Sequence, residues 1–462
     1  IRDRDQRVDY LVVGAGAMGM AFTDTLMTES DATVAIVDRH HQPGGHWNLA
    51  YPFVRLHQPS SFYGVNSRPL GEDRIDTRGL NSGLYELASK SEICAYYDNV
   101  MRDFLASGRV QYFPMCEYED DGRITSRVCG DAHPVTANTI VDATYMNVRV
   151  PAMGDPAYEV AEGVQCVPPN ALAELNGDWA NYVVVGAGKT SVDACLFLLE
   201  NGTHPDHICW IKPRDSWLWD RAKAQSAELF EESIRPFTIG QITAAAESES
   251  LEDLFARANA AGLLLRIDET VEPTMFRCAT VTQSEIAQLR RITNVVRMGR
   301  VKRIETGRVI LDGGSFETGP GTLHIDCTAD GLASRPPRPV FDEGRITLQS
   351  IRTCQQVFSA AFIAHIEIAE QDPARKNLLC TPVPHPDTAM DFLRTMLGDL
   401  ANGALWSQDD SIMKWLKAAR LDGFSYTGSS PPSDAAFQAN IESAGAIAAE
   451  KLMVYLAENA SQ

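Results

Sequence analysis

Long apolar runs and an excess of basic residues are both missing from this sequence. No uncharged apolar stretch approaches the roughly 18–20 residues that a membrane-spanning helix requires. Lys and Arg number 41 against 61 Asp and Glu, which gives a formal net charge of −20. Because nucleic acids and anionic membrane surfaces attract cationic proteins, this balance argues against either partner. No signal-peptide pattern opens the sequence, so we expect a cytoplasmic location.

Closely spaced cysteine pairs are also lacking. Neither a CxxC nor a CxxxxC motif occurs, which excludes a redox-active disulfide of either spacing. The intervals match no zinc motif, so we predict no metal site. Several cysteines lie within apolar runs, where a thiol behaves as a small buried hydrophobic group in a reducing compartment. The ten cysteines occupy positions 94, 116, 129, 166, 195, 209, 278, 327, 354 and 380.

What the sequence does contain is a glycine-rich turn between an apolar run and a helix-like segment. Val8–Val13 is followed by Gly14-Ala-Gly16-Ala-Met18-Gly19. Gly14 permits a tight turn, Gly16 lets the backbone approach a pyrophosphate, and Gly19 lets the helix pack close to the sheet. Met18 starts a four-residue apolar repeat on this helix, whose N-terminal amides would face the phosphates. The segment therefore predicts a dinucleotide-binding turn.

A second apolar strand follows this helix and ends in an acid. The strand is Thr33–Val37, and Asp38 lies nineteen residues beyond Gly19. An acid at this position accepts hydrogen bonds from the adenosine ribose hydroxyls. Asp38 and its neighbour Arg39 are thus candidate cofactor-binding residues. The alternative is a glycine-rich turn followed by a surface aspartate.

A second glycine turn occurs after the apolar run Tyr182–Val185. Its last residue, Ser191, replaces the third glycine, and a small residue suffices there because the requirement is close helix–strand packing. A lysine and a threonine after a glycine resemble a triphosphate-binding P-loop, but that motif needs glycine at position 183, which is Val. The residues predicted to contact a second dinucleotide are Gly186, Gly188, Lys189, Thr190 and Ser191.

The strand after the second turn ends in positive charge. His207–Ile211 continues into Lys212-Pro-Arg214. An acid would repel the 2′-phosphate of NADPH, whereas Lys and Arg attract it, and Arg can bind a phosphate with two parallel hydrogen bonds. We therefore expect Lys212 and Arg214 to select NADPH. The alternative is a basic surface loop.

The segment after Asp38 carries further motifs. Gly44-Gly45-His46-Trp47 is followed by Tyr51-Pro52 and then by residues 55–64. In these motifs the chain resembles the two-dinucleotide-binding flavoproteins, in particular the flavin monooxygenase group. The resemblance implies FAD at the first turn, with Gly45 and Trp47 beside its pyrophosphate. It also implies that residues 55–64 run beside the isoalloxazine ring.

The same resemblance suggests side chains close to the flavin. Gln58 and Asn66 are candidates for the reactive edge, although both could instead satisfy backbone groups of their loop. Gln349 is a candidate for contact with the ribityl chain. The stretch 160–169 has the glycine of the FxGxxxHxxx fingerprint of flavin monooxygenases and Baeyer–Villiger enzymes but neither its Phe nor its His.

The order of these motifs predicts an α/β protein with two Rossmann-like, three-layer dinucleotide-binding domains, the second inserted into the first, and helices at the C-terminus. Residues 323–331 repeat the strand–acid–threonine pattern of 139–144, which we interpret as the return to the first domain. An acidic helical stretch at about 222–265 either caps the active site or forms solvated surface. The predicted segments are an FAD-binding part at 1–150, a linker at 151–177, an NADPH-binding domain at 178–310, the FAD-binding return at 311–385 and a helical segment at 386–462.

Together, these features predict an enzyme with FAD and NADPH as cofactors. The first hypothesis is a single-component monooxygenase that oxygenates a small organic molecule with O₂ through a flavin C4a-(hydro)peroxide. The second is an NADPH-dependent flavin reductase or dehydrogenase without oxygen transfer, which the incomplete fingerprint favours. The third is a flavin-binding protein without catalytic activity.

Overall fold

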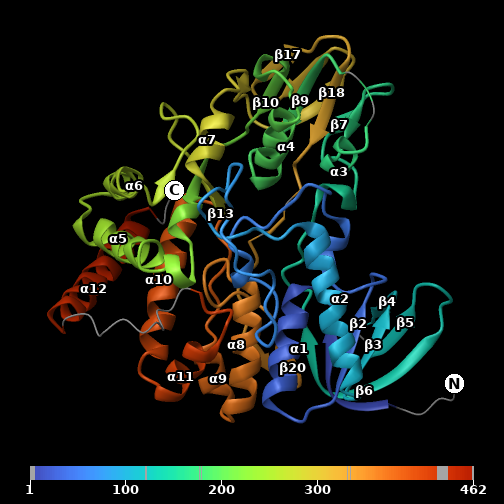
Figure 1. The fold of residues 1–462 in the computed structure, drawn as a ribbon, viewed down its shortest axis with the longest axis vertical. Helices are drawn as coiled ribbons and strands as arrows, with labels where there is room; N and C mark the ends of the chain where they lie inside the picture. Colours follow the sequence, from blue (N-terminus) through green and yellow to red (C-terminus); the bar gives the residue numbers. More distant parts are fainter. Residues whose placement is uncertain are drawn as a thin grey trace.

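The computed structural model of the protein describes residues 6–459, except 120–121, 176, 178, 330, 333 and 424–434. Two parallel sheets dominate its architecture, one at each end of the molecule in Figure 1. The predicted boundaries at 1, 178 and 462, and residue Asp330 of the stretch 323–331, lie outside the described residues. No helix in the described part of the chain is both long and apolar enough to cross a membrane.

The first sheet has the order β19-β20-β6-β1-β2-β3, and its central strands pair in parallel. Its strands are β1 (Gln6–Val13), β2 (Val34–Asp38), β3 (Val110–Pro114), β6 (Ala132–Asp142), β19 (Phe341–Asp342) and β20 (Arg345–Thr347). The helices packed on one face are α1 (Ala17–Glu29), α2 (Lys90–Ala106) and α8 (Gln356–Ala369), and α9 (Pro373–Leu379) follows α8. The other face is covered by β4 (Cys116–Tyr118) and β5 (Arg123–Ser126), which continue the same sheet in antiparallel fashion from the first residues of β6. Every residue of β2 is consequently buried, as expected for a parallel strand covered on both faces.

The second sheet has the order β14-β10-β9-β18-β8, with all neighbours parallel. Its strands are β8 (Cys166–Val167), β9 (Asn181–Val185), β10 (Ile208–Ile211), β14 (Val295–Val296) and β18 (Thr322–Asp326). The helices on one face are α3 (Pro169–Leu172), α4 (Lys189–Glu200) and α7 (Gln283–Leu289). The other face is covered by a small sheet of β7 (Glu159–Val160), β15 (Val301–Glu305), β16 (Arg308–Leu311) and β17 (Gly314–Glu317). Each large sheet thus forms the middle of three layers, and the predicted two-domain α/β fold is confirmed.

The chain returns to the first sheet later than the sequence pattern predicted. Residues 322–326 form β18, which pairs with β8 and β9, so the predicted return at 323–331 is wrong. The return is β20, which pairs in parallel with β6. The repeated pattern was misleading because both sheets use the same turn: Thr144 donates to Asp142, and Thr328 donates to Asp326. Insertion of the second sheet between strands of the first is nevertheless confirmed.

A third sheet and four helices share a separate core, whose buried side chains include Phe237, Leu254, Phe392 and Leu452. The sheet consists of β11 (Ser216–Asp220), β12 (Leu264–Leu265) and β13 (Met275–Val281). The helices are α5 (Ile234–Glu247), α6 (Leu251–Ala260), α10 (Ala389–Trp406) and α12 (Ala435–Glu458). Figure 1 shows α5 and α12 side by side although they are about half the chain apart. The helical stretch expected at 222–265 is therefore packed against the C-terminal helices and is more than solvated surface.

The helical segment predicted from residue 386 onward begins with α10. Thr388 is the N-cap residue and forms a capping box with Asp391. Asp387, the residue before it, instead binds Arg214 and Arg277. The following helix, α11 (Asp410–Ala418), buries Ile412 and Leu416 in the core of the first sheet.

Candidate active site

Both glycine turns open onto one cavity of about 1150 Å³. Gly14, Gly16 and Met18 line it from the first turn, and Gly186, Gly188, Lys189 and Thr190 line it from the second. The carboxyl ends of parallel strands are where ligands bind in folds of this kind, because the strand-to-helix loops gather there. The two glycine turns predicted from the sequence thus line a single cavity in the structure.

The first turn is held in close backbone contact with the loop that follows Asp38. Gly14 has a φ of +105°, and a Cβ on Gly19 would lie 2.0 Å from the carbonyl oxygen of Gly14. A Cβ on Gly45 would lie only 2.9 Å from the Cα of Gly16. Glycine is required at Gly45 for a second reason, since its φ is +56°. Glycine at these positions lets the turn and the loop approach each other closely and leaves their backbones free of side chains, as a pyrophosphate-binding turn requires.

Asp38 holds the first turn in place. Its carboxylate accepts hydrogen bonds from the backbone N–H of Ala15 at 2.6 Å and of His40 at 2.7 Å. Asp38 and Arg39 both line the cavity, and their contact with a ribose stays a prediction. Trp47 also lines the cavity, and its indole N–H donates to the hydroxyl of Tyr63 at 2.6 Å.

One residue of the second turn points into the protein core and away from the cavity. Ser191 is fully buried and donates to the carbonyl oxygen of Gly188 at 2.7 Å, so it serves helix–strand packing and does not line the cavity. Gly186 has a φ of +132°, and a Cβ there would meet the carbonyl oxygen of Cys327 at 2.9 Å. Lys189 forms an ion pair with Asp193, which also accepts from Tyr51 at 2.6 Å.

Only one of the two predicted phosphate-selecting cations reaches the cavity. Lys212 is 3% exposed and paired with Asp215, which also accepts from Arg297 at 2.8 Å. Burial lowers the pKa of Lys212, while Asp215 opposes this effect. Arg214 lines the cavity and donates twice to Asp387, at 2.9 Å each. Lys212 therefore stabilises the strand end and does not line the binding surface.

The cavity has further arginines that the sequence analysis did not select. They are Arg149, Arg277, Arg300 and Arg335. Nε of Arg335 is buried and has no hydrogen-bond partner among the described residues, as expected where an anionic ligand is to be received. Arg277 lies on β13 of the third sheet and the other three lie in loops, and they follow no common motif, so the sequence offered no signal for them.

The three predicted residues near the flavin are placed differently from one another. Gln58 lines the cavity, and its amide oxygen accepts from the side chain of Gln355 at 3.3 Å. Asn66 lies outside the cavity lining and accepts from the backbone N–H of Leu421 at 3.1 Å. Gln349 is buried, and both ends of its amide bond the backbone of Arg338 at 3.0 Å. Asn66 and Gln349 thus support loops, and neither lines the cavity.

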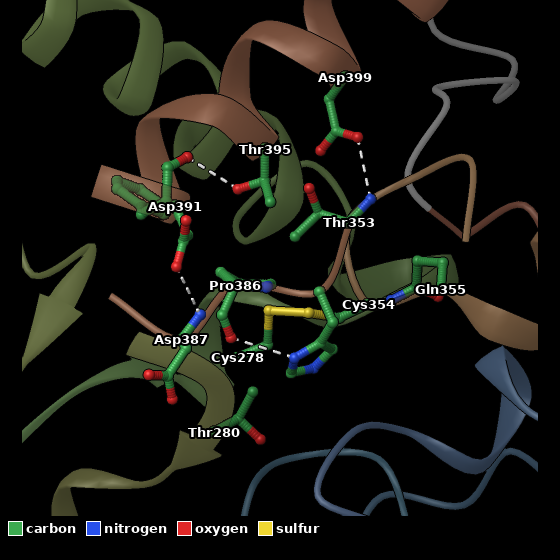
Figure 2. Close-up of a disulfide and its surroundings, with 12 residues drawn as sticks. Cys278, Thr280, Thr353, Cys354, Gln355, Pro386, Asp387, Asp391, Thr395 and Asp399 are labelled. Carbon is green, nitrogen blue, oxygen red and sulfur yellow. Dashed lines mark hydrogen bonds between the residues drawn. A yellow bond between two sulfur atoms is a disulfide. The ribbon is translucent and has the colours of Figure 1, made fainter. Parts of the chain in front are cut away.

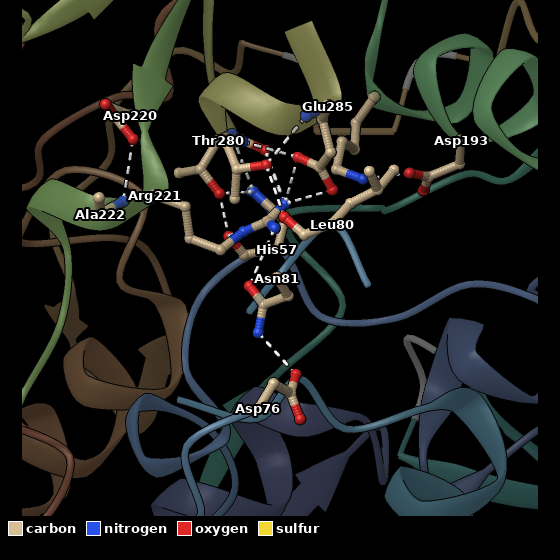
Figure 3. A network of polar contacts seen from close by, with 12 residues as sticks. His57, Asp76, Leu80, Asn81, Asp193, Asp220, Arg221, Ala222, Thr280 and Glu285 are labelled. Atoms are coloured by element: carbon tan, nitrogen blue, oxygen red, sulfur yellow. Dashed lines mark hydrogen bonds and ion pairs between the residues drawn. The ribbon is translucent and has the colours of Figure 1, made fainter. Parts of the chain in front are cut away.

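Beside Gln58 lies a buried polar network (Figure 3). Arg221 is 1% exposed, and its guanidinium donates to Glu285 at 2.9 Å and to the carbonyl oxygen of His57 at 3.1 Å. The pKa of His57 falls to about 3, because burial disfavours the charged ring and Lys189 and Arg221 add positive charge. Nδ1 of His57 accepts from the backbone N–H of Thr280 at 3.2 Å, so the neutral ring carries its proton on Nε2. His57 is a cavity-lining residue that the sequence analysis missed.

A disulfide forms another part of the cavity wall. Cys278 on β13 is bonded to Cys354, 76 residues later, just before α8 (Figure 2). The expectation that cysteines are small buried hydrophobic groups is therefore wrong for this pair, which no short motif could have revealed. It fits Cys116, Cys195 and Cys209, which are buried and unbonded.

The first comparison concerns the first glycine turn. A sequence model of the NAD(P)-binding Rossmann-like domain family matches residues 12–50, which include Gly14–Gly19 and Asp38.

Among solved structures, the open crystal structure of cyclohexanone monooxygenase has a TM-score of 0.48 and 15% sequence identity. That likeness covers 78% of this chain and 88% of that chain.

Relatives among curated proteins are more similar in sequence. "Putative FAD-containing monooxygenase MymA" of Mycobacterium tuberculosis is 24% identical over 202 residues, which is 41% of this chain and 38% of MymA. "Uncharacterized protein Rv2000" of M. tuberculosis and "Uncharacterized protein Mb2023" of Mycobacterium bovis are each 56% identical over 416 residues. That alignment covers 90% of this chain and 77% of each relative. Such identity over most of both chains shows that this chain belongs to the family of Rv2000 and Mb2023.

Proposed function

We propose that the protein is an FAD-dependent monooxygenase that uses NADPH as reductant and places one oxygen atom of O₂ on a small organic molecule. The observation that carries the proposal is that both glycine turns line one cavity. Two dinucleotides bound there would have their reactive rings within one enclosed space. The name of MymA, an FAD-containing monooxygenase related over 202 residues, supports the same assignment.

The two turns are assigned to different dinucleotides. We assign FAD to the first turn, because Gly45 of the Gly44–Trp47 segment lies against Gly16 and Asp38 ends the strand before that segment. The family description over residues 12–50 specifies a dinucleotide fold and names NAD(P), so the choice of FAD rests on that added segment. We assign NADPH to the second turn, where Arg214 lines the cavity and would exchange Asp387 for the 2′-phosphate.

Bound FAD would supply hydride acceptance and reaction with O₂, which no amino-acid side chain provides. The protein's contribution is binding, orientation and exclusion of water. The Asp38 carboxylate fixes the turn that would bind the pyrophosphate. Arg335 and Arg149 add positive charge to the wall of the same cavity. Neutral His57 can donate a hydrogen bond from Nε2 without adding a charge to the wall. Gln58, held by Gln355, keeps its amide at the cavity surface.

The test is oxygen transfer itself. Purified protein is supplied with FAD, NADPH and isotopically labelled O₂, together with a cyclic ketone or a thioether as probe. We expect labelled oxygen in the organic product, with one NADPH oxidised for each oxygen atom transferred. Stoichiometric release of H₂O₂ with either probe unchanged would contradict the proposal for these substrate classes.

The second candidate is an NADPH-dependent flavin reductase or dehydrogenase. The stretch 160–169, which contains β8, lacks the Phe and His of the monooxygenase fingerprint, and this favours the reductase. Under that alternative, NADPH would still reduce the flavin, and a quinone-like acceptor would accelerate turnover. A cytoplasmic location stays a prediction in either case.

A further inference from the structure

The Cys278–Cys354 disulfide lies where redox chemistry is expected. Both cysteines line the cavity of the two glycine turns, together with His385. The two sulfur atoms and a ring nitrogen of His385 all lie within 4.8 Å of one another. Nδ1 of His385 is 3.1 Å from the carbonyl oxygen of Pro386, a contact that orients the ring. A histidine in this position can exchange a proton with a thiol.

The disulfide is tied to the loop that the sequence places beside the flavin ring. Gln355, which follows Cys354, donates to Gln58 at 3.3 Å. Thr280, two residues after Cys278, donates its backbone N–H to His57 at 3.2 Å. Both arms of the disulfide therefore contact consecutive residues of the segment 55–64. The sulfurs therefore line the same cavity as the segment that the sequence resemblance places beside the isoalloxazine ring.

The backbone is specially shaped at both cysteines. Cys278 has a φ of +55° and Cys354 a φ of +57°, a region that residues other than glycine seldom adopt. Cys278 lies in a bulge of β13, because Trp217 and Trp219 of β11 pair with Phe276 and Thr280. Bulges and left-handed residues of this kind gather at functional sites, where they direct a side chain toward a ligand. The left-handed conformation occurs at both ends of this bond, and the bulge occurs at its Cys278 end.

We propose that Cys278–Cys354 is a redox-active disulfide that accepts two electrons from reduced FAD in this cavity. The inference rests on the proposed function, which supplies the reductant. The anionic flavin hydroquinone gives two electrons and one proton, and the S–S bond breaks to yield one thiol and one thiolate. A proton from solvent completes the dithiol, and the flavin is left oxidised. Cys354 precedes the N-terminus of the fourteen-residue α8, whose positive end stabilises a thiolate.

The experiment is an anaerobic titration of the FAD-loaded protein with dithionite, which needs no NADPH site. We expect four electrons per flavin in the wild type, and ten thiols after reduction where eight react before it in denaturant. The double variant Cys278→Ser/Cys354→Ser should take two electrons and keep eight thiols throughout. Cys129→Ser removes an exposed, unbonded cysteine, so this control should still take four electrons.

Three results would overturn the inference. A wild type that binds FAD but takes only two electrons contradicts it and leaves the proposed function intact. Stoichiometric zinc in the purified protein, with ten thiols before reduction, would assign the cysteines and His385 to a metal. A protein that binds no FAD contradicts the proposed function and the inference together. If the double variant is poorly folded, single Cys354→Ala protein provides the same electron count, with circular dichroism as the folding check.

Discussion

At the scale of single residues, the sign of a charge was not enough to predict the role of a side chain, because that role depends on the groups around it. Lys212 and Arg214 are two positions apart in sequence, yet Lys212 is buried and paired with Asp215, whereas Arg214 lines the cavity. Asn66 and Gln349 were predicted beside the flavin and instead satisfy backbone groups. A sequence reveals which groups an amide or ammonium can bind, but the fold decides which of them it meets: Lys212 pairs with Asp215 in its own loop, whereas Asn66 meets Leu421 from the other end of the chain.

The environments of Lys212 and Arg214 predict opposite effects of their removal. Arg214→Ala should raise the KM for NADPH about tenfold and leave that for NADH nearly unchanged, because the 2′-phosphate loses about 1.4 kcal/mol of binding. Lys212→Ala should leave the cofactor preference intact and lower stability by roughly 1.5–3 kcal/mol, because Asp215 loses one charged hydrogen-bond partner and keeps Arg297. Steady-state kinetics and urea unfolding measure the two effects. Equal loss for both cofactors in Arg214→Ala would contradict the assignment.

Gly45 is predicted to be irreplaceable for flavin binding. Gly45→Ala adds a Cβ that would lie 2.9 Å from the Cα of Gly16, so the cradle must open and FAD affinity should fall at least about tenfold. Gly108→Ala is the matched control, since Gly108 has a φ of +72° with no atom near its Cβ position. Flavin absorbance after gel filtration measures retention. Equal FAD retention in the two variants would show that the close contact between Gly45 and Gly16 is unimportant for flavin binding.

His57 should make stability depend on pH. Its pKa is about 3 in the folded state and 6.5 as the ordinary value, so the unfolded chain binds the additional proton between these limits. The contribution is therefore fully present above pH 6.5 and is lost as pH falls, by about 1.4 kcal/mol per pH unit. His57→Asn should show a shallower decline than wild type in urea unfolding from pH 7 to 4. The exposed control His41→Asn should match wild type, and parallel curves for all three would contradict the account.

At the scale of elements, local pattern predicted the kinds of element well and their sheet membership less well. The C-terminal helical segment predicted at 386–462 contains α10, α11 and α12. β18 was assigned to the wrong sheet because the turn after Asp326 is the same as the turn after Asp142. Local sequence specifies a strand end, whereas pairing between β18 and β9 depends on contacts more than a hundred residues apart.

The shared core of α5, α6, α10 and α12 has a direct test. Leu452 is fully buried, so Leu452→Ala should lower the free energy of unfolding by about 2–5 kcal/mol. Met453, the next residue, is 56% exposed, and Met453→Ala should change it by less than about 0.5 kcal/mol. Urea unfolding of both variants gives the comparison. A Leu452→Ala protein as stable as wild type would mean that α12 is not part of this core.

At the scale of the whole molecule, the inserted second sheet determines the site. The chain leaves the first sheet after β6, builds the second, and returns at β20, so the strand ends carrying the two glycine turns line one cavity. The glycines and Asp38 could be predicted because each does its work locally. The disulfide, His57 and the cavity arginines could not, since each depends on segments that meet only in the folded chain.

The central claim is that electrons pass from a nicotinamide at the second turn to a flavin at the first. Anaerobic mixing of the FAD-loaded protein with NADPH, followed by visible absorbance, tests it most directly. We expect a yellow protein whose flavin band is bleached by NADPH, and faster than by NADH at equal concentration. A protein that retains no FAD, or one whose bound flavin stays oxidised in the presence of NADPH, would contradict the claim.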